Sequence, residues 1–218
     1  MSLRFAEEIL LLALDDKSGK LHALPEGSLN LAIAGGLIME LAFSNVIDTD
    51  DKSLQVLSRE KMGDQLLDDV LAKIPEESPL SIQRALNAVT ADIDTWKSRL
   101  FDELKERGIL QQEEHRFLFV LKERRYPVID DREEQEVKLR IREVVLDHEA
   151  IPDPRDVVVI CLMNACDLSS VVFSEHELEQ HRARIETIAK MDFVGQALSQ
   201  AVNKIQQALL EVMAYSGM

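Results

Sequence analysis

Hydrophobic residues recur at spacings of three and four along most of the chain, as they do in helices with one buried face. Residues 29–44 are apolar on nearly every side, so this helix is predicted to lie at the centre of the core. Gly35 and Gly36 inside it indicate close packing against a second helix. The predicted helices are residues 5–14, 29–44, 64–74, 80–89, 93–107, 130–146, 157–168, 175–190 and 193–214.

Capping residues mark several of these boundaries. Ser28 and Ser174 each precede an apolar-periodic segment and are predicted N-caps. Ser78 with Pro79 at the first helical position would open the helix at 80–89. Gly108 is predicted to end the helix at 93–107 in the left-handed conformation.

One segment has a clear β pattern. Residues 109–111 and 116–121 are predicted to form a hairpin around a polar turn at 112–115, and residues 54–57 fit a short strand. No Pro/Gly/Ser-rich linker divides the chain, so residues 1–218 are expected to form a single domain. The predicted fold class is all-α with one β-hairpin.

Charge narrows the range of partners. The 218 residues contain 25 Lys and Arg against 40 Asp and Glu, a formal net charge of −15. This net negative charge argues against generic nucleic-acid binding, which needs a basic face. A helix followed by a basic hairpin is also typical of a winged helix, a DNA-binding arrangement. The net charge counts against that class as well. We therefore expect no nucleic-acid partner.

The segment 116–125 is locally basic, with four cations against Glu123. Charge of this kind commonly protects an exposed strand edge from aggregation. The alternative is a surface for an anionic lipid or an acidic partner. The sequence leaves both interpretations open.

No motif of enzymatic chemistry is present. Cys161 and Cys166 lie in an apolar segment as buried free thiols would, and His176 and His181 are five residues apart, a poor spacing for two ligands on one helix face. We predict no catalytic residues, no metal site and no cofactor. No apolar run reaches the roughly 18 residues of a membrane-spanning helix, so a cytoplasmic protein, peripheral at most on the cytosolic membrane face, is expected.

An ordered set of segments resembles the GPP34 family, whose eukaryotic members are the Golgi phosphoprotein 3 proteins. The segments are 8–15 (EILLLALD), 34–42 (AGGLIMELA), 104–110 (LKERGIL), 117–119 (FLF), 126–127 (YP) and 162–168 (LMNACDL). These segments occur in the family's order over nearly the whole chain. The residue pattern is more similar to a prokaryotic branch of the family than to its eukaryotic members.

This resemblance implies a helical domain with a protruding hairpin and no enzymatic activity. It implies binding of phosphatidylinositol 4-phosphate or another anionic headgroup, recognition of protein tails, and self-assembly through the hairpin. The family's headgroup contacts fall on Pro25, Ala34, Asp94 and Lys97, so Lys97 keeps a cation, with Arg99 close by. The predicted hairpin and oligomer surface consists of Arg116, Phe117, Phe119, Lys122, Arg124 and Arg125.

A protein–protein scaffold that has lost lipid binding is the alternative function. An enzyme of unnamed chemistry ranks last.

Overall fold

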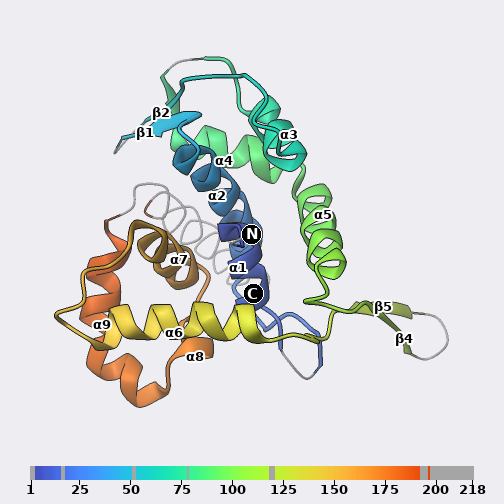
Figure 1. Cartoon of the computed structure of the whole chain (residues 1–218), viewed down its shortest axis with the longest axis vertical. Helices are drawn as coiled ribbons and strands as arrows, with labels where there is room; N and C mark the ends of the chain where they lie inside the picture. The colour runs from blue at the N-terminus through green and yellow to red at the C-terminus, as the bar shows by residue number, and fades with distance from the viewer. Residues whose placement is uncertain are drawn as a thin grey trace, which may run out of the picture.

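The fold is a set of helices packed around α2, with a small sheet at one end and a hairpin at the side (Figure 1). The computed structural model describes residues 3–15, 18–50, 53–77, 79–117, 121–191 and 196, and only the backbone of 114–117 and 121–124. The described elements are α1 (Phe5–Leu12), α2 (Ser28–Phe43), β1 (Ile47–Thr49), β2 (Ser53–Val56), α3 (Gln65–Lys73), β3 (Leu80–Ser81), α4 (Ile82–Thr90), α5 (Ile93–Glu106), β4 (Glu113–Phe117), β5 (Leu121–Arg125), α6 (Arg132–Leu146), α7 (Pro154–Ala165), α8 (Ser169–Val172) and α9 (Glu175–Ala189). The mainly helical fold class is confirmed.

Helix α2 forms the centre of the core, as predicted. It contacts α1, α3, α4, α5 and α7. A methyl group added at Gly36 would lie 2.9 Å from the backbone nitrogen of Ala6 on α1, so this glycine lets two helix backbones approach closely. The predicted capping role of Ser28 is wrong. Gly27 is the N-cap at φ +74°, and the Ser28 hydroxyl inside the helix donates to the carbonyl of Pro25 at 2.7 Å.

A three-stranded antiparallel sheet, in the order β1-β2-β3, packs near the start of α4. The pattern predicted only its central strand. The helix predicted over 80–89 starts later, at Ile82, because Leu80 pairs with Leu54 in the sheet. The N-cap of α4 is therefore Ser81, whose hydroxyl accepts from the Arg84 amide at 3.3 Å, and Ser78, the predicted cap, lies outside the described residues.

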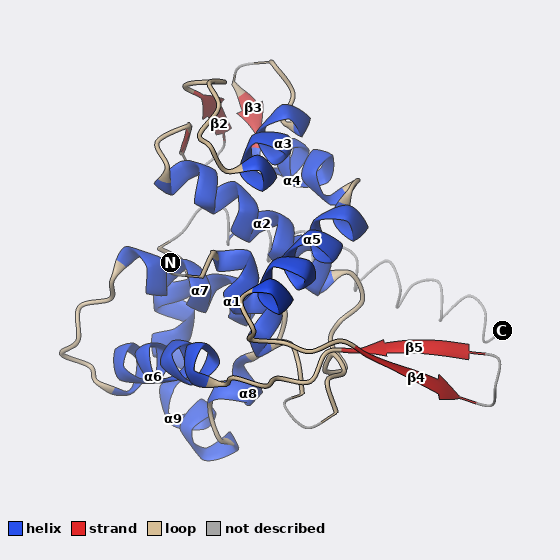
Figure 2. Ribbon diagram, turned by 45° about the vertical axis from the view of Figure 1, so that its right-hand side comes forward, coloured by secondary structure: helices blue, strands red, loops and turns tan. Residues whose placement is uncertain are grey.

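The hairpin exists, but the predicted strand limits are wrong. Residues 113–117 pair with 121–125, so the predicted turn at 112–115 lies largely within the first strand. Ile109 and Leu110 are instead buried beside the body of the protein, where Leu110 forms an isolated bridge with Val128. Hydrophobicity marked these two residues as strand, whereas the actual strands are mostly charged. Figure 2 shows β4 and β5 extending away from the helices.

Tyr126 attaches the base of the hairpin to the body of the protein. The Tyr126 ring stacks on Phe101 of α5 with ring centres 3.8 Å apart, and the Tyr126 amide donates to the Gly19 carbonyl at 2.8 Å. A methyl group at Gly19 would lie 2.4 Å from the nitrogen of Pro127, and φ of Gly19 is +62°. The hairpin therefore leaves the body in a direction set by α5 and by the loop that contains Gly19.

Helices α6 and α9 lie where the pattern predicts them, but the helix predicted at 157–168 is wrong at both ends, because α7 ends at Ala165 and the unpredicted short helix α8 follows at Ser169–Val172. The capping role of Ser174 is confirmed, since its hydroxyl accepts from the Glu177 amide, while α7 begins at Pro154, three residues earlier than predicted. The helix predicted at 193–214 falls almost entirely outside the described residues, and the single domain over 1–218 stays a prediction. Within the described part of the chain, no helix has both the length and the hydrophobicity needed to cross a membrane.

Candidate functional site

A pocket of about 620 Å³ opens where α1, α2, α3 and α5 meet. It lies beside the first turn of α1 and the last turn of α5. Its lining is mainly charged and consists of Arg4, Glu7, Glu40, Ser44, Met62, Asp64, Leu67, Glu103 and Arg107. Four carboxylates against two guanidinium groups make the pocket negative in balance.

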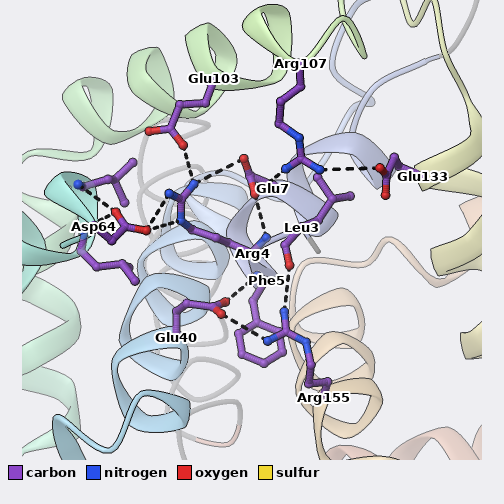
Figure 3. A network of polar contacts seen from close by, with 12 residues as sticks. Leu3, Arg4, Phe5, Glu7, Glu40, Asp64, Glu103, Arg107, Glu133 and Arg155 are labelled. Carbon is purple, nitrogen blue, oxygen red and sulfur yellow. Dashed lines mark hydrogen bonds and ion pairs between the residues drawn. The ribbon is translucent and has the colours of Figure 1, made fainter. Parts of the chain in front are cut away.

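Arg4 is the hub of this pocket. Its guanidinium lies 2.7 Å from Asp64 at the start of α3 and 3.4 Å from Glu7, and it also pairs closely with Glu103 of α5 (Figure 3). Burial alone would lower the pKa of Arg4, but the hydrogen bonds to Asp64 and Glu103 outweigh it and hold that pKa above its usual value. One side chain thus connects three helices.

The carboxylates around Arg4 differ in their environment. Glu7 is 1% exposed, and burial raises its pKa although its carboxylate accepts from the Arg4 amide at 2.7 Å and lies 3.6 Å from Arg107. Asp64 is less buried. Burial also acts to raise its pKa, but Arg4 and the amides of Leu66 and Leu67 hold the pKa below its usual value. Asp64 therefore serves both as the N-cap of α3 and as the partner of Arg4.

A second arginine continues the network toward α7. Arg155 donates to the carbonyl of Leu3 at 2.9 Å and to Glu40 at 3.2 Å, and its guanidinium lies 4.0 Å from the ring centre of Phe5 (Figure 3). The Phe5 amide donates to Glu40 at 3.0 Å. The segment before α1 is thereby held between α2 and α7.

The chemistry of this pocket is that of ion pairing. Its charged side chains are engaged in ion pairs, and its described lining contains no histidine, cysteine or lysine. Residue patterns along the chain do not predict this pocket. Its one signal was Glu7 and Glu8 inside an apolar helix, since buried carboxylates need cationic partners.

The structure does not bring the predicted headgroup residues together. Lys97 lies 3.2 Å from both Asp94 and the Asn30 side chain, whereas Arg99 pairs with Asp69 of α3 at 2.6 Å. Residues two positions apart on a helix are separated by roughly 200° about the helix axis. The two cations therefore lie on opposite sides of the buried stripe of α5.

The other positions around this face are also charge-compensated or apolar. Ala34 is fully buried in α2, and Pro25 lies in the loop before that helix. Two further cations, on α3 and α4, also have carboxylate partners. Lys73 pairs with Asp92 at 2.6 Å, and Arg84 pairs with Glu77. The predicted role of Lys97 and Arg99 stays a prediction.

The hairpin register sorts the predicted cations into two groups. Arg125 and Arg124 stand opposite Glu113 and Glu114, at the base of the hairpin. Nearer the tip, Arg116 stands opposite Lys122, which places two cations at one level. Phe117 pairs with Leu121 beyond them, and Phe119 lies outside the described residues.

The cysteines and histidines take up different environments. Cys161 and Cys166 are buried free thiols, and burial raises the pKa of Cys166 to about 12, which keeps it protonated. No group of three or more metal-ligating side chains occurs within the described ranges. His181 pairs with His148 rather than with His176, and their ring centres are 5.4 Å apart. No local pattern predicts this pair, because the two residues are far apart along the chain.

Comparisons of the sequence with known proteins show what this chain is similar to. The sequence profile of the family described as Golgi phosphoprotein 3 (GPP34) matches residues 5–205. Vacuolar protein sorting-associated protein 74 of Eremothecium gossypii is 25% identical over 215 aligned positions, which cover 82% of this chain and 64% of the relative. The chain therefore spans a little under two thirds of the length of the curated relative it matches.

Proposed function

Because the chain belongs to the GPP34 family, we propose that it is a non-enzymatic, Golgi phosphoprotein 3-like binding module that meets an anionic lipid surface from the cytoplasm. Phosphatidylinositol 4-phosphate is the headgroup that the family resemblance implies. The charged pocket around Arg4 supports the non-enzymatic part of the proposal, since its side chains are engaged in ion pairs that hold helices together.

The observation that carries the lipid proposal is the hairpin register. Arg116 and Lys122 stand opposite each other on strands that project from the body, and the residues between them, 117–121, are all apolar in sequence (FLFVL). A basic residue near an anionic membrane contributes about 1 kcal/mol of binding free energy. Two such residues bordering an apolar segment match the chemistry of a headgroup layer above hydrocarbon.

Lys97 and Arg99 are proposed as a secondary contact. Each must exchange a carboxylate partner for a lipid phosphate, Asp94 in the first case and Asp69 in the second. Breaking the existing ion pair offsets part of the binding free energy gained from the lipid phosphate. The contribution of Lys97 and Arg99 is therefore expected to be smaller than that of the hairpin cations.

Vesicle flotation with charge-reversal variants tests this assignment. Vesicles would contain phosphatidylinositol 4-phosphate, phosphatidylserine or only phosphatidylcholine. The double variant Arg116→Glu with Lys122→Glu is expected to lose at least roughly 30-fold in partitioning, the equivalent of two contacts of about 1 kcal/mol each. Lys97→Glu is expected to lose less.

A matched control keeps the net charge equal. Lys61→Glu with Arg132→Glu makes the same change at two exposed positions on the body, and it should bind nearly as well as the unmodified chain. An equal loss in both double variants would show that overall charge, and not the hairpin, determines binding, and it would overturn the assignment.

The second candidate function is a protein–protein scaffold that assembles through the hairpin. It is favoured by the compensated charges on α5 and by the two-stranded sheet of β4 and β5, which leaves an unpaired edge on each strand within the described part of this chain. Light scattering after size exclusion would test it. A scaffold predicts a stable oligomer that Phe117→Asp or Phe119→Asp dissociates, with no flotation on any vesicle.

A further inference from the structure

Two histidines that the proposed function does not use lie together at the junction of α6 and α9. His148 follows the last turn of α6 and is exposed, while His181 is part of α9 and is partly buried. Their ring centres are 5.4 Å apart and the ring planes are inclined by 34°. The Nδ1 atom of His181 is buried and has no hydrogen-bond partner within the described structure.

Two arginines fix the elements that carry this pair. Arg184 of α9 donates to the carbonyls of Val144, Asp147 and Ala150 at 2.9–3.3 Å, which ties the end of α6 and the following loop to α9. Arg142 of α6 donates to Glu177 of α9 at 2.6 Å. His181 is four residues after Glu177 and three before Arg184, so all three lie on the face of α9 that meets α6.

This spacing suits two ligands of one metal ion. Imidazoles that bind one zinc ion at about 2.0–2.1 Å with near-tetrahedral angles have ring centres roughly 5 Å apart. His181 on a fixed helix can supply one ring nitrogen, and the exposed His148 on the adjoining loop can turn to supply the other. Imidazole nitrogen is a preferred ligand of zinc, copper and nickel and a poor one for magnesium or calcium.

We propose that His148 and His181 form a chelating site for a divalent transition-metal ion of the zinc class, with the remaining coordination positions open to water or to an outside ligand. This site is separate from the hairpin and from the pocket around Arg4. The charge of Arg184 is directed into three backbone carbonyls, and Arg142 is neutralised by Glu177. Asp147 and Glu149 flank His148 in the sequence and favour a cation there.

Titration of the full chain with Zn²⁺ at pH 7.5, followed by calorimetry, tests the proposal. At this pH most imidazoles are neutral and able to bind metal. The unmodified chain should take up one equivalent of Zn²⁺ that His148→Ala removes. Since His148 is exposed, that variant should remain folded, and circular dichroism would verify it. His181→Gln should remove the same equivalent.

His176→Ala is the matched control, because His176 is an exposed histidine on the same helix outside the pair. It should bind like the unmodified chain. Binding that persists in the His148→Ala variant, that His176→Ala removes equally well, or that is missing from the unmodified chain would each overturn the site.

Discussion

Glu7 and Glu8 are neighbours on α1 and both are almost fully buried, at 1% and 2% exposure. Glu7 faces Arg4 and Arg107, whereas Glu8 faces Arg140, which donates to its Oε1 atom at 3.1 Å. The second oxygen of Glu8 has no hydrogen-bond partner among the described residues. At the scale of single residues, burial of charge therefore requires arginines from distant parts of the chain.

The stability of the fold should depend on the protonation of Glu8. Burial raises the pKa of Glu8 above its ordinary value of 4.5, so the folded state binds this proton more tightly than the unfolded state. The contribution of Glu8 to the free energy of unfolding is then largest below that value and falls as the pH rises through the raised pKa.

Urea unfolding of the unmodified chain and of Glu8→Gln, from pH 4.5 to 7.5, measures this effect. The free energy of unfolding of the unmodified chain minus that of the variant should fall with rising pH, and the subtraction removes titrations that both proteins share. A difference that rises with pH, or that stays constant, would contradict the account.

Gly36 gives a second test at this scale. In an exposed helix, Gly→Ala stabilises by about 1 kcal/mol. Here the added methyl group would lie 2.9 Å from the Ala6 backbone, so we expect Gly36→Ala to destabilise the protein by about 1–3 kcal/mol, the usual cost of overpacking. Chemical unfolding decides the sign, and a more stable variant would show that α1 and α2 are not held in close contact.

At the scale of elements, capping residues close in sequence determine most helix boundaries, and strand pairing shifts the others. Asp64, Ser174 and Gly108 mark boundaries that the sequence predicted, since each acts on its own helix end. The start of α4 was misplaced because Leu80 pairs with Leu54, and the hairpin limits were misplaced because charged residues form its strands. Strand partners far apart in sequence leave no local signal.

The attachment of the hairpin to the body also depends on contacts between elements. Gly19→Ala should loosen the hairpin base, because its methyl group would lie 2.4 Å from the Pro127 nitrogen. Hydrogen exchange of the β5 amides should accelerate as a result. Gly63→Ala is the matched control, since Gly63 also has a positive φ, +85°, but has no neighbour within 4 Å of the added atom. Equal effects of the two variants would mean that backbone strain alone, and not contact with Pro127, is responsible.

At the scale of the whole molecule, the network around Arg4 joins segments that the sequence keeps apart. Its partners Asp64 and Glu103 are 60 and 99 residues away along the chain. Composition predicts an acidic protein with one locally basic segment, but the pairing of individual charges could only be read from the fold. The same holds for Lys97 and Arg99, which the sequence placed close together and the helix separates.

Loss of Arg4 should therefore destabilise the whole molecule. Arg4→Ala leaves Arg107, 3.6 Å away, as the cationic partner of the buried Glu7 within the described part of the chain. We expect a loss of about 2 kcal/mol or more, below the roughly 3–5 kcal/mol of a fully buried pair because Asp64 and Glu103 stay partly hydrated. Arg132→Ala breaks an exposed pair with Asp130 and should leave the free energy of unfolding nearly unchanged. Urea unfolding compares the two, and equal losses would contradict the role of Arg4 as a hub.

The most direct test of the proposed function is flotation of the unmodified chain on vesicles with and without anionic lipid, at low and at physiological salt. We expect binding to anionic vesicles that weakens as salt rises, and no binding to neutral vesicles, because salt screens the attraction between the hairpin cations and the anionic lipids. Binding that is strongest with phosphatidylinositol 4-phosphate at physiological salt would add a specific headgroup site. No flotation on any vesicle at either salt concentration would contradict the lipid proposal and leave the scaffold function in its place.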